Sequence, residues 1–309
     1  MADSFLTLAQ LVTINNSNLA DRDITDLLND APVLAQLAAD VSPYTTHSYV
    51  KETTQPTVGF RSANDGRDNS KSADTQVDVT LKILDASFAV DKGIADAWRR
   101  GPEDFIAREA ARHLRAAFFA AEAQVLKGTV GGAAAGFSGL ADALLFGGAM
   151  VVNAGGTTAA TGSSVYAVRS TPDLNNVSVI MGANGMIDVG ETVVARLAGA
   201  TGTYPAYYTP ISAWMGLQIG SSYSAGRICN ITEDSGKKLT DALLAQLIEK
   251  FPAGRGPNYL VMNRRSLRQL QASRTATNPT GAPAPFPSEA FGIPIVVTDA
   301  ISSTEALLS

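Results

Sequence analysis

The feature that most constrains this fold is a pair of strand-like segments joined by a polar stretch. Residues 61–74, RSANDGRDNSKSAD, contain no large apolar side chain, whereas residues 48–60 and 75–90 on either side have the composition of long strands. An isolated two-stranded ribbon is only marginally stable in water. Its neighbours must therefore come from the rest of the chain or from other chains. The pattern alone also allows a hairpin that folds down on its own domain.

Apolar side chains on the second strand switch phase part-way along. They occupy alternate positions from Val77 to Ile83 and then the opposite phase from Leu84 to Val90. Period-2 alternation predicts a strand, and the switch indicates a β-bulge or a change of buried face. As one strand, residues 76–90 would span about 50 Å at roughly 3.3 Å per residue.

The first arm of the ribbon, residues 46–60, has features of an exposed edge. Pro56 and Gly59 suit an edge strand rather than a central one. Asp65-Gly66 predicts the turn at the tip. The polar segment is therefore expected at the end of an exposed hairpin.

The clearest single element is a helix over residues 102–127. Gly101 at the N-cap, Pro102 at the first helical position and Gly128 at the end are typical helix-boundary residues. Apolar residues recur at helical spacing along one face. The polar face carries three arginines, which we interpret as salt-bridge partners or a solvated surface rather than a phosphate site: Arg108, Arg112 and Arg115.

Residues 1–42 are mostly helical by pattern. Asp21 or Asp23 can cap a helix, and Pro32 breaks or restarts the pattern. These short segments have little local core to bury against. We therefore expect an arm that lies on something else.

The rest of the chain mixes strands and helices, which indicates an α+β fold. The predicted strands are residues 164–170, 177–183, 212–222, 226–232, 259–263 and 291–301, and the predicted helices are residues 138–146, 239–251 and 264–274. Pro294, near the start of the last strand, favours an edge position.

Composition excludes several classes of function. The net charge is −5 and no basic stripe is present, which argues against a nucleic-acid binder. The single cysteine, Cys229, excludes an internal disulfide and a Cys-based zinc site. His47 and His113 lie in very different contexts, so a two-histidine metal site is not expected. Without a membrane-span or signal-peptide pattern, we expect an intracellular protein that needs no cofactor.

No catalytic constellation stands out. The Gly-rich run at residues 128–139 has neither a dinucleotide-binding nor a P-loop pattern, and GFSGL lacks the spacing of a nucleophile elbow. Asp21/Asp23 and Glu233/Asp234 are paired carboxylates that could serve acid–base roles. Nothing in the sequence places them in an apolar pocket. We therefore predict that the chain is not an enzyme.

The order of these elements resembles the major capsid proteins of tailed bacteriophages, which have the Hong Kong 97-like fold. The resemblance rests on the arm, the polar-tipped hairpin, the helix begun by GPEDF, and the pair YLVMNRRSLRQL and FGIPIVVTDAIS. It implies an α+β capsid fold in four parts. These are an N-terminal arm over residues 1–45, an extended loop over 46–90, a peripheral domain over 91–235 with the spine helix at 102–127, and an axial domain over 236–309.

The resemblance also implies a function. The chain would be a subunit that self-assembles into the icosahedral capsid of a tailed phage and encloses double-stranded DNA without sequence-specific binding or membrane contact. The missing neighbours of the ribbon would be other copies, contacted through the charged tip residues Arg61, Asp65, Arg67, Asp68 and Lys71. Implied partners are further copies in hexamers and pentamers, a separate scaffolding protein, a portal and a minor cement protein. Assembly would take place in the host cytoplasm.

Two other interpretations stay open from the sequence. The same fold suits an encapsulin-like nanocompartment shell, which cargo docking would distinguish. The third interpretation is a soluble α+β enzyme of unknown chemistry. The unsupported ribbon and the lack of paired catalytic residues count against it.

Overall fold

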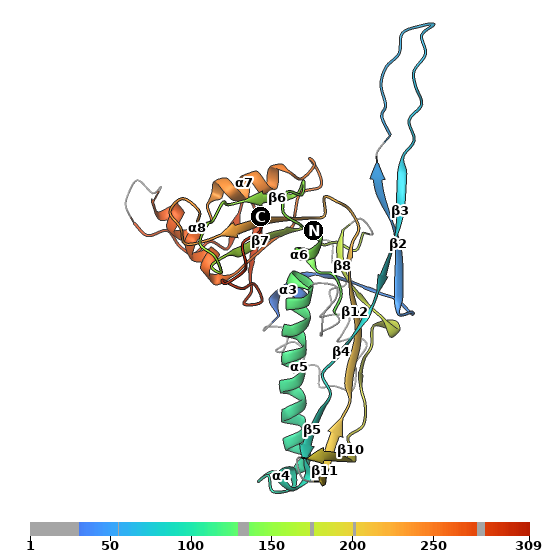
Figure 1. Cartoon of the computed structure of the whole chain (residues 1–309), viewed down its shortest axis with the longest axis vertical. Helices are drawn as coiled ribbons and strands as arrows, with labels where there is room; N and C mark the ends of the chain where they lie inside the picture. The colour runs from blue at the N-terminus through green and yellow to red at the C-terminus, as the bar shows by residue number, and fades with distance from the viewer. Residues whose placement is uncertain (1–30, 55, 129–135, 174–175, 200–201, 277–281) are drawn as a thin grey trace.

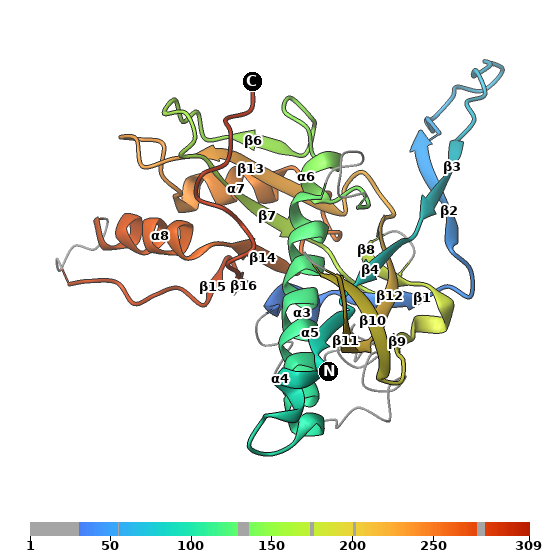
Figure 2. The same ribbon diagram turned by 60° about the horizontal axis from the view of Figure 1, so that its bottom comes forward.

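The computed structural model describes residues 31–54, 56–128, 136–173, 176–199, 202–276 and 282–309. A long helix, α5 (Pro102–Lys127), runs through the middle of the molecule (Figure 1). A two-stranded ribbon projects well beyond the rest of the chain. Figure 2 shows a sheet with helices α7 and α8 on one side of α5 and the ribbon on the other.

The predicted helix over residues 102–127 is confirmed at both ends. Gly101 caps it with a φ of +95°, a backbone conformation that favours glycine, and Pro102 occupies the first turn. The buried face of α5 follows the apolar stripe seen in the sequence, with Leu114, Phe118 and Val125 in the core.

Helix α5 packs against a five-stranded sheet, which we call the peripheral sheet. Its strand order is β1-β8-β12-β4, and β9 also pairs with β12. The side chains that alternate toward α5 form part of one continuous core. The strands are β1 (Ala38–Val41), β4 (Lys82–Asp85), β8 (Val177–Met181), β9 (Ile187–Val189) and β12 (Ile211–Ile219).

A small sheet and a short helix lie at the far end of α5 (Figure 1). The sheet has the order β10-β11-β5, and helix α4 follows β5. Strands β9, β10 and β11 were not predicted from the sequence. The elements are β5 (Phe88–Asp91), α4 (Lys92–Asp96), β10 (Val193–Gly199) and β11 (Gly202–Thr209).

The C-terminal half contributes most of a six-stranded sheet, which we call the axial sheet. Its order is β15-β16-β14-β7-β13-β6. Strands β6, β7 and β13 precede residue 236. The expected boundary between the peripheral and axial domains, after residue 235, therefore divides this sheet. The elements are α6 (Leu140–Ala143), β6 (Val151–Asn153), β7 (Ser163–Val168), β13 (Ala225–Ile231), α7 (Asp241–Glu249), β14 (Tyr259–Met262), α8 (Arg264–Ala276), β15 (Glu289–Ala290) and β16 (Ile293–Val297).

Sequence predictions for this region hold with small shifts. Helix α7 begins after Thr240, whose hydroxyl accepts a hydrogen bond from the Leu243 amide at 3.4 Å. Pro294 was expected on an edge strand, but the two-residue strand β15 pairs with β16 and makes the outermost position. None of the helices among the described residues is long and apolar enough to cross a membrane.

The ribbon consists of β2 (Thr46–Thr54) and β3 (Ala73–Thr80). The single strand expected over residues 76–90 is divided into β3, β4 and β5, each of which pairs in a different sheet. The phase switch seen in the sequence is therefore a change of buried face. Ile83 keeps the phase of Val79 and Leu81 but is exposed, whereas Leu84, in the opposite phase, packs against the core.

Residues 1–42 were expected to be mostly helical and to form an arm. For residues 37–42 the helical expectation is wrong, because α3 (Pro32–Gln36) leads into β1, which pairs in parallel with β8. Val33 and Leu34 are buried in the core of the same chain. Pro32 restarts the helix, as expected. Asp21, Asp23 and the predicted helices before residue 31 lie outside the described residues.

Glu122 fastens the arm to α5 and to the axial sheet. Its carboxylate accepts hydrogen bonds from the amides of Val33 at 2.8 Å and Leu34 at 3.2 Å, and from the hydroxyl of Thr298 just beyond β16. Burial raises the pKa of Glu122 above its usual value, and these hydrogen bonds oppose the rise.

Candidate functional site

The ribbon forms a sheet of its own. β2 pairs only with β3 among the described strands, in antiparallel register from Thr46–Thr80 to Thr54–Ala73. Beyond this ladder, residues 56–72 form a loop that we call the tip loop, and its residues are exposed. Figure 1 shows the tip loop as the most distant part of the molecule. The alternative of a hairpin folded onto its own domain is wrong.

The turn at the end of the tip loop differs from the expected Asp65-Gly66 turn. The Asp65 amide donates to the Ser62 carbonyl at 3.3 Å, and Asn64 takes the left-handed conformation with a φ of +64°. Asparagine tolerates this conformation better than most residues do. Gly66 instead follows the turn, where its amide donates to the Asp65 carboxylate at 2.9 Å.

Contacts across the tip loop hold its two passes together. The Arg67 guanidinium donates to the Thr57 carbonyl at 2.7 Å, and the Thr57 amide donates to the Ser70 hydroxyl at 2.7 Å. Arg61 reaches the Asp65 carbonyl at 3.1 Å. Three of the five predicted contact residues, Arg61, Asp65 and Arg67, therefore also shape the loop. Asp68 and Lys71 are exposed.

The tip loop also carries two large apolar side chains outside the predicted polar set. Val58 is 86% exposed and Phe60 is fully exposed. Burying side chains of this size is worth about 1.5–3 kcal/mol each. They were missed from the sequence because residues 46–60 were assigned to an arm of the ribbon and contacts were sought only among the polar residues of the tip. The available signal was Pro56, because a proline disfavours regular strand pairing and Val58 and Phe60 follow it at two and four residues.

A socket in the peripheral sheet holds the root of the ribbon. Leu81, between β3 and β4, is 1% exposed and lies over two glycines, one in β12 and one just after β8. A Cβ at Gly216 would come within 2.5 Å of Leu81 Cδ2, and one at Gly182 within 2.7 Å of Leu81 Cδ1. Only glycine gives Leu81 this room.

Two polar contacts complete the root. His47 Nε2 lies 2.8 Å from Gln218 Oε1, and the Tyr49 hydroxyl donates to the Ile219 carbonyl at 3.0 Å. Both partners belong to β12. The ribbon is therefore fastened at one end to the peripheral sheet, and at the other end its strands pair with no further strand of the described residues.

A cleft of about 780 Å³ opens beside this root. Ribbon residues such as Tyr49 and Val77 form one wall, and Leu144 and Met150 near α6 form the opposite wall. Its lining is mainly apolar. Another molecule could enter this concave surface next to the ribbon.

The carboxylate pair proposed for acid–base chemistry has structural partners instead. Asp234 accepts hydrogen bonds from the amides of Thr157 at 2.9 Å and Thr158 at 3.1 Å, and hydrogen bonding lowers its pKa well below the usual range. Glu233 forms ion pairs with Arg268 and Lys238. Asp234 therefore ties the loop that follows β13 to the loop that follows β6, and Glu233 ties the same loop to helix α8.

The remaining candidates for chemistry are also accounted for. His113 stacks on Phe88 with ring centroids 4.9 Å apart, and Arg112 pairs with Glu109 at 2.5 Å. Cys229 is buried in β13. Among the described residues, no cluster of three or more His, Cys, Asp or Glu side chains could hold a metal ion.

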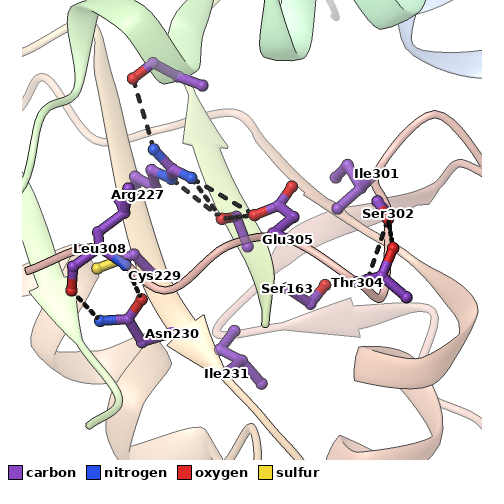
Figure 3. A network of polar contacts seen from close by, with 12 residues as sticks. Ser163, Arg227, Cys229, Asn230, Ile231, Ile301, Ser302, Thr304, Glu305 and Leu308 are labelled. Atoms are coloured by element: carbon purple, nitrogen blue, oxygen red, sulfur yellow. Dashed lines mark hydrogen bonds and ion pairs between the residues drawn. The ribbon is translucent and has the colours of Figure 1, made fainter. Parts of the chain in front are cut away.

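The axial sheet differs from the ribbon because its polar groups are paired internally. The Ser164 hydroxyl donates to Glu305 at 2.6 Å, and Arg227 donates to the same hydroxyl at 2.9 Å and lies 3.4 Å from Glu305 (Figure 3). Asn230 binds the backbone of Leu308 in both directions, at 2.9 and 2.8 Å. We call this set the C-terminal clamp, because it ties the end of the chain to the sheet.

Comparison with known proteins gives a consistent result. The family model described as major capsid protein GP7 matches residues 20–309. A solved structure of bacteriophage Epsilon15 is similar over 100% of this chain and 98% of that chain, with a TM-score of 0.58 and 18% identity. No curated protein sequence matches.

Two further solved structures match more weakly. The bacteriophage JBD30 capsid matches with a TM-score of 0.47 and 11% identity, over 86% of this chain and 89% of that chain. The SrpI encapsulin from Synechococcus elongatus matches with a TM-score of 0.43 and 10% identity, over 65% of this chain and 87% of that chain.

Proposed function

The chain belongs to the major capsid protein GP7 family, and from this premise we propose how its copies hold one another in a shell. It is a structural protein of a bacteriophage capsid with the Hong Kong 97-like fold, and it is not an enzyme. Its copies assemble into a multimeric icosahedral shell. The proposal concerns the part of the chain that makes the contacts.

We propose that the tip loop is an intersubunit contact. The observation that carries this proposal is the ribbon itself, which pairs with no other described strand and exposes both Val58 and Phe60 at its far end. A two-stranded ribbon is marginal alone and gains stability from a neighbour. The charged residues proposed to take part are Arg61, Asp65, Arg67, Asp68 and Lys71.

The division of the chain into parts is also a proposal. We keep an N-terminal arm up to residue 45 and an extended loop over residues 46–90. Because β6, β7 and β13 share one sheet with β14 and β16, we now place residues 150–170 and 224–235 in the axial domain. The peripheral domain is then built around α5 and the peripheral sheet.

We further propose the partners of the assembled shell. A closed icosahedral shell has five-fold vertices, so the same chain would form pentamers as well as hexamers. A separate scaffolding protein, a portal and a minor cement protein are proposed partners, with assembly in the host cytoplasm. The shell would enclose double-stranded DNA without sequence-specific contacts, which suits the net charge of −5.

The test replaces residues 56–72 by a two-residue Asn-Gly turn and leaves β2 and β3 intact. We expect a folded subunit by circular dichroism and size-exclusion chromatography, but no rings or shells by negative-stain electron microscopy. The matched control is Ser72→Ala, which keeps the tip loop at full length and should assemble as well as the intact chain. All three chains are prepared in parallel, with and without a scaffolding protein.

Shells of normal yield from the shortened chain would overturn the role of the tip loop. Nuclease-protected double-stranded DNA inside isolated particles distinguishes a phage capsid from a nanocompartment shell that carries protein cargo.

A further inference from the structure

Aspartate or asparagine is followed by glycine at two places in the sequence, Asp65-Gly66 in the tip loop and Asn184-Gly185 before β9. At such a pair the glycine nitrogen can attack the side-chain carbonyl carbon and close a cyclic imide, a succinimide, because glycine has no Cβ to hinder the approach. In an unstructured chain the asparagine amide reacts faster than the aspartate carboxyl group. The sequence alone therefore ranks Asn184 above Asp65 as a site of spontaneous chemical change.

The fold blocks this chemistry at Asn184. The Gly185 amide donates to the Gly182 carbonyl at 2.9 Å, and Gly185 is buried. Asn184 is held in the left-handed conformation with a φ of +60°, and its own amide donates to the Ser42 carbonyl at 3.2 Å. Ring closure would turn the Gly185 nitrogen toward the Asn184 side chain and break this turn. Folding therefore protects the pair that is more reactive in sequence.

The pair in the tip loop has the opposite surroundings. The Gly66 amide donates to the Asp65 carboxylate at 2.9 Å, so the attacking nitrogen already lies beside the group that it must reach. Both residues are exposed. A Cβ built on Gly66 would meet nothing within 4 Å, so the chain has room to rotate here. Neither burial nor a competing hydrogen bond of the kind seen at Gly185 opposes ring closure.

Arg61 supplies a second condition for ring closure. Its guanidinium donates to the Asp65 carbonyl oxygen at 3.1 Å, and this oxygen belongs to the same peptide group as the attacking Gly66 nitrogen. A positively charged donor on a peptide oxygen stabilises the form of that peptide group that has lost its N–H proton. The Gly66 nitrogen therefore gives up its proton more readily here than in an unfolded chain, where the contact with Arg61 is absent.

We propose that the tip loop carries a self-modification site at which Asp65 converts to isoaspartate. The Gly66 nitrogen bonds to Cγ of Asp65, a Cγ–O bond of the neutral carboxyl group breaks, and the hydroxyl leaves as water with the amide proton. A second water then opens the succinimide. Attack at Cγ restores Asp65, whereas attack at the former backbone carbonyl breaks its bond to the Gly66 nitrogen. The backbone then runs through the side chain of residue 65.

Isoaspartate changes the shape of the tip loop. It adds a methylene group to the backbone and turns the carbonyl that Arg61 contacts into a free carboxylate. The turn closed by the Asp65 amide and the Ser62 carbonyl then loses its regular backbone spacing. Water is lost and regained, so the conversion needs no oxidant, reductant or second chain. The inference therefore goes beyond the proposed function and does not depend on it.

The test follows the unassembled full chain during incubation at neutral pH, with the same chain unfolded in guanidinium chloride as the reference. Electron-transfer dissociation mass spectrometry locates isoaspartate, and hydroxylamine traps the succinimide. We expect isoaspartate at residue 65 to form about threefold faster in the folded chain, and deamidation of Asn184 to be at least about tenfold slower there. A rate at Asp65 that is no higher in the folded chain would overturn the inference. An Asn184 rate unaffected by folding would overturn the protection assigned to its turn.

Substitutions separate the parts of the site. Gly66→Ala introduces a Cβ that meets nothing else in the fold and should slow isoaspartate formation about tenfold, because the Cβ hinders the attack. Arg61→Met should slow it about threefold. Lys51→Met is the matched control, because it removes the same charge from β2 and should leave the rate unchanged. Equal rates for Arg61→Met and Lys51→Met would overturn the role of Arg61, and an unchanged rate in Gly66→Ala would overturn the succinimide route.

Discussion

The C-terminal clamp and the ribbon treat their polar and apolar groups in opposite ways. In the clamp, Arg227 and Glu305 have side chains that are only 7% exposed, and both bind the Ser164 hydroxyl. In the tip loop, Phe60 is fully exposed and the charged residues are at the surface. The polar groups of the clamp are paired within one chain, whereas the side chains of the tip are exposed and available for contacts with another molecule.

This contrast shows where the free energy of each region comes from. A buried and fully paired network belongs to the stability of the subunit, because removing one partner leaves an uncompensated charge. Exposed groups contribute little to that stability. Substitutions should therefore divide into those that unfold the subunit and those that change only assembly.

The largest expected effect is in the clamp. Glu305→Ala leaves Arg227 buried without its carboxylate, which should lower the free energy of unfolding by about 3–5 kcal/mol in urea denaturation. The control is Asp299→Ala, which breaks the exposed Arg264–Asp299 pair and should cost at most about 1 kcal/mol. Similar losses in the two variants would show that the clamp is not specially stabilising.

The next effect is at the junction between the two regions. Gly216→Ala places a Cβ against Leu81, which should cost about 1–3 kcal/mol of unfolding free energy and loosen the ribbon root. Hydrogen exchange of β2 and β3 should become faster. Gly66→Ala is the matched control, because a Cβ there meets nothing within 4 Å. Unchanged exchange in Gly216→Ala would mean that the socket does not position the ribbon.

A smaller effect follows from Glu122. Burial raises its native pKa above 4.5, so the native state binds more protons than the unfolded state between these two values. The contribution of Glu122 to stability is therefore greatest below pH 4.5 and declines as the pH rises through the native pKa. Above that pH it is constant.

Unfolding of the wild type and Glu122→Gln between pH 4.5 and 8 checks this prediction. The stability difference between them should fall as the pH rises, whereas Glu103→Gln, in the first turn of the same helix, serves as the control. A pH-independent difference for Glu122→Gln would contradict the prediction. Hydrogen exchange in the ribbon should not follow this titration.

The smallest effect on the subunit is expected in the tip loop. Arg67→Ala removes the bond to the Thr57 carbonyl from an exposed site, so the free energy of unfolding should change by no more than about 0.5 kcal/mol. Limited proteolysis within residues 56–72 should nevertheless become faster. A large loss of stability would show that the tip is part of the folded core.

Elements with strong local signals were predictable from the sequence. The bounds of α5 follow from Gly101, Pro102 and the apolar stripe, and β14 follows from its buried run. Strand β10 was missed because it is largely exposed, and β11 was missed because it lacks a clear apolar alternation. The division of residues 76–90 among three sheets depends on distant partners, which no local pattern records.

The site was predictable only in part. The polar tip and its exposed position follow from residues 61–74, because such a segment has nothing to bury. The exposure of Phe60 could not be inferred, since an aromatic residue in a strand usually implies a covered face. The socket of Gly182 and Gly216 was also missed, because it joins two segments with Leu81 from a third.

The run of chain through β3, β4 and β5 has a mechanical consequence. These strands follow one another down the length of the molecule, and each is bonded side by side to a different partner (Figure 1). A pull on the tip is therefore transmitted along the strand axes. Antiparallel hydrogen bonds lie across that direction, so they are loaded together in shear rather than opened one at a time. The subunit should therefore resist tension through its ribbon strongly, because several hydrogen bonds must break at once.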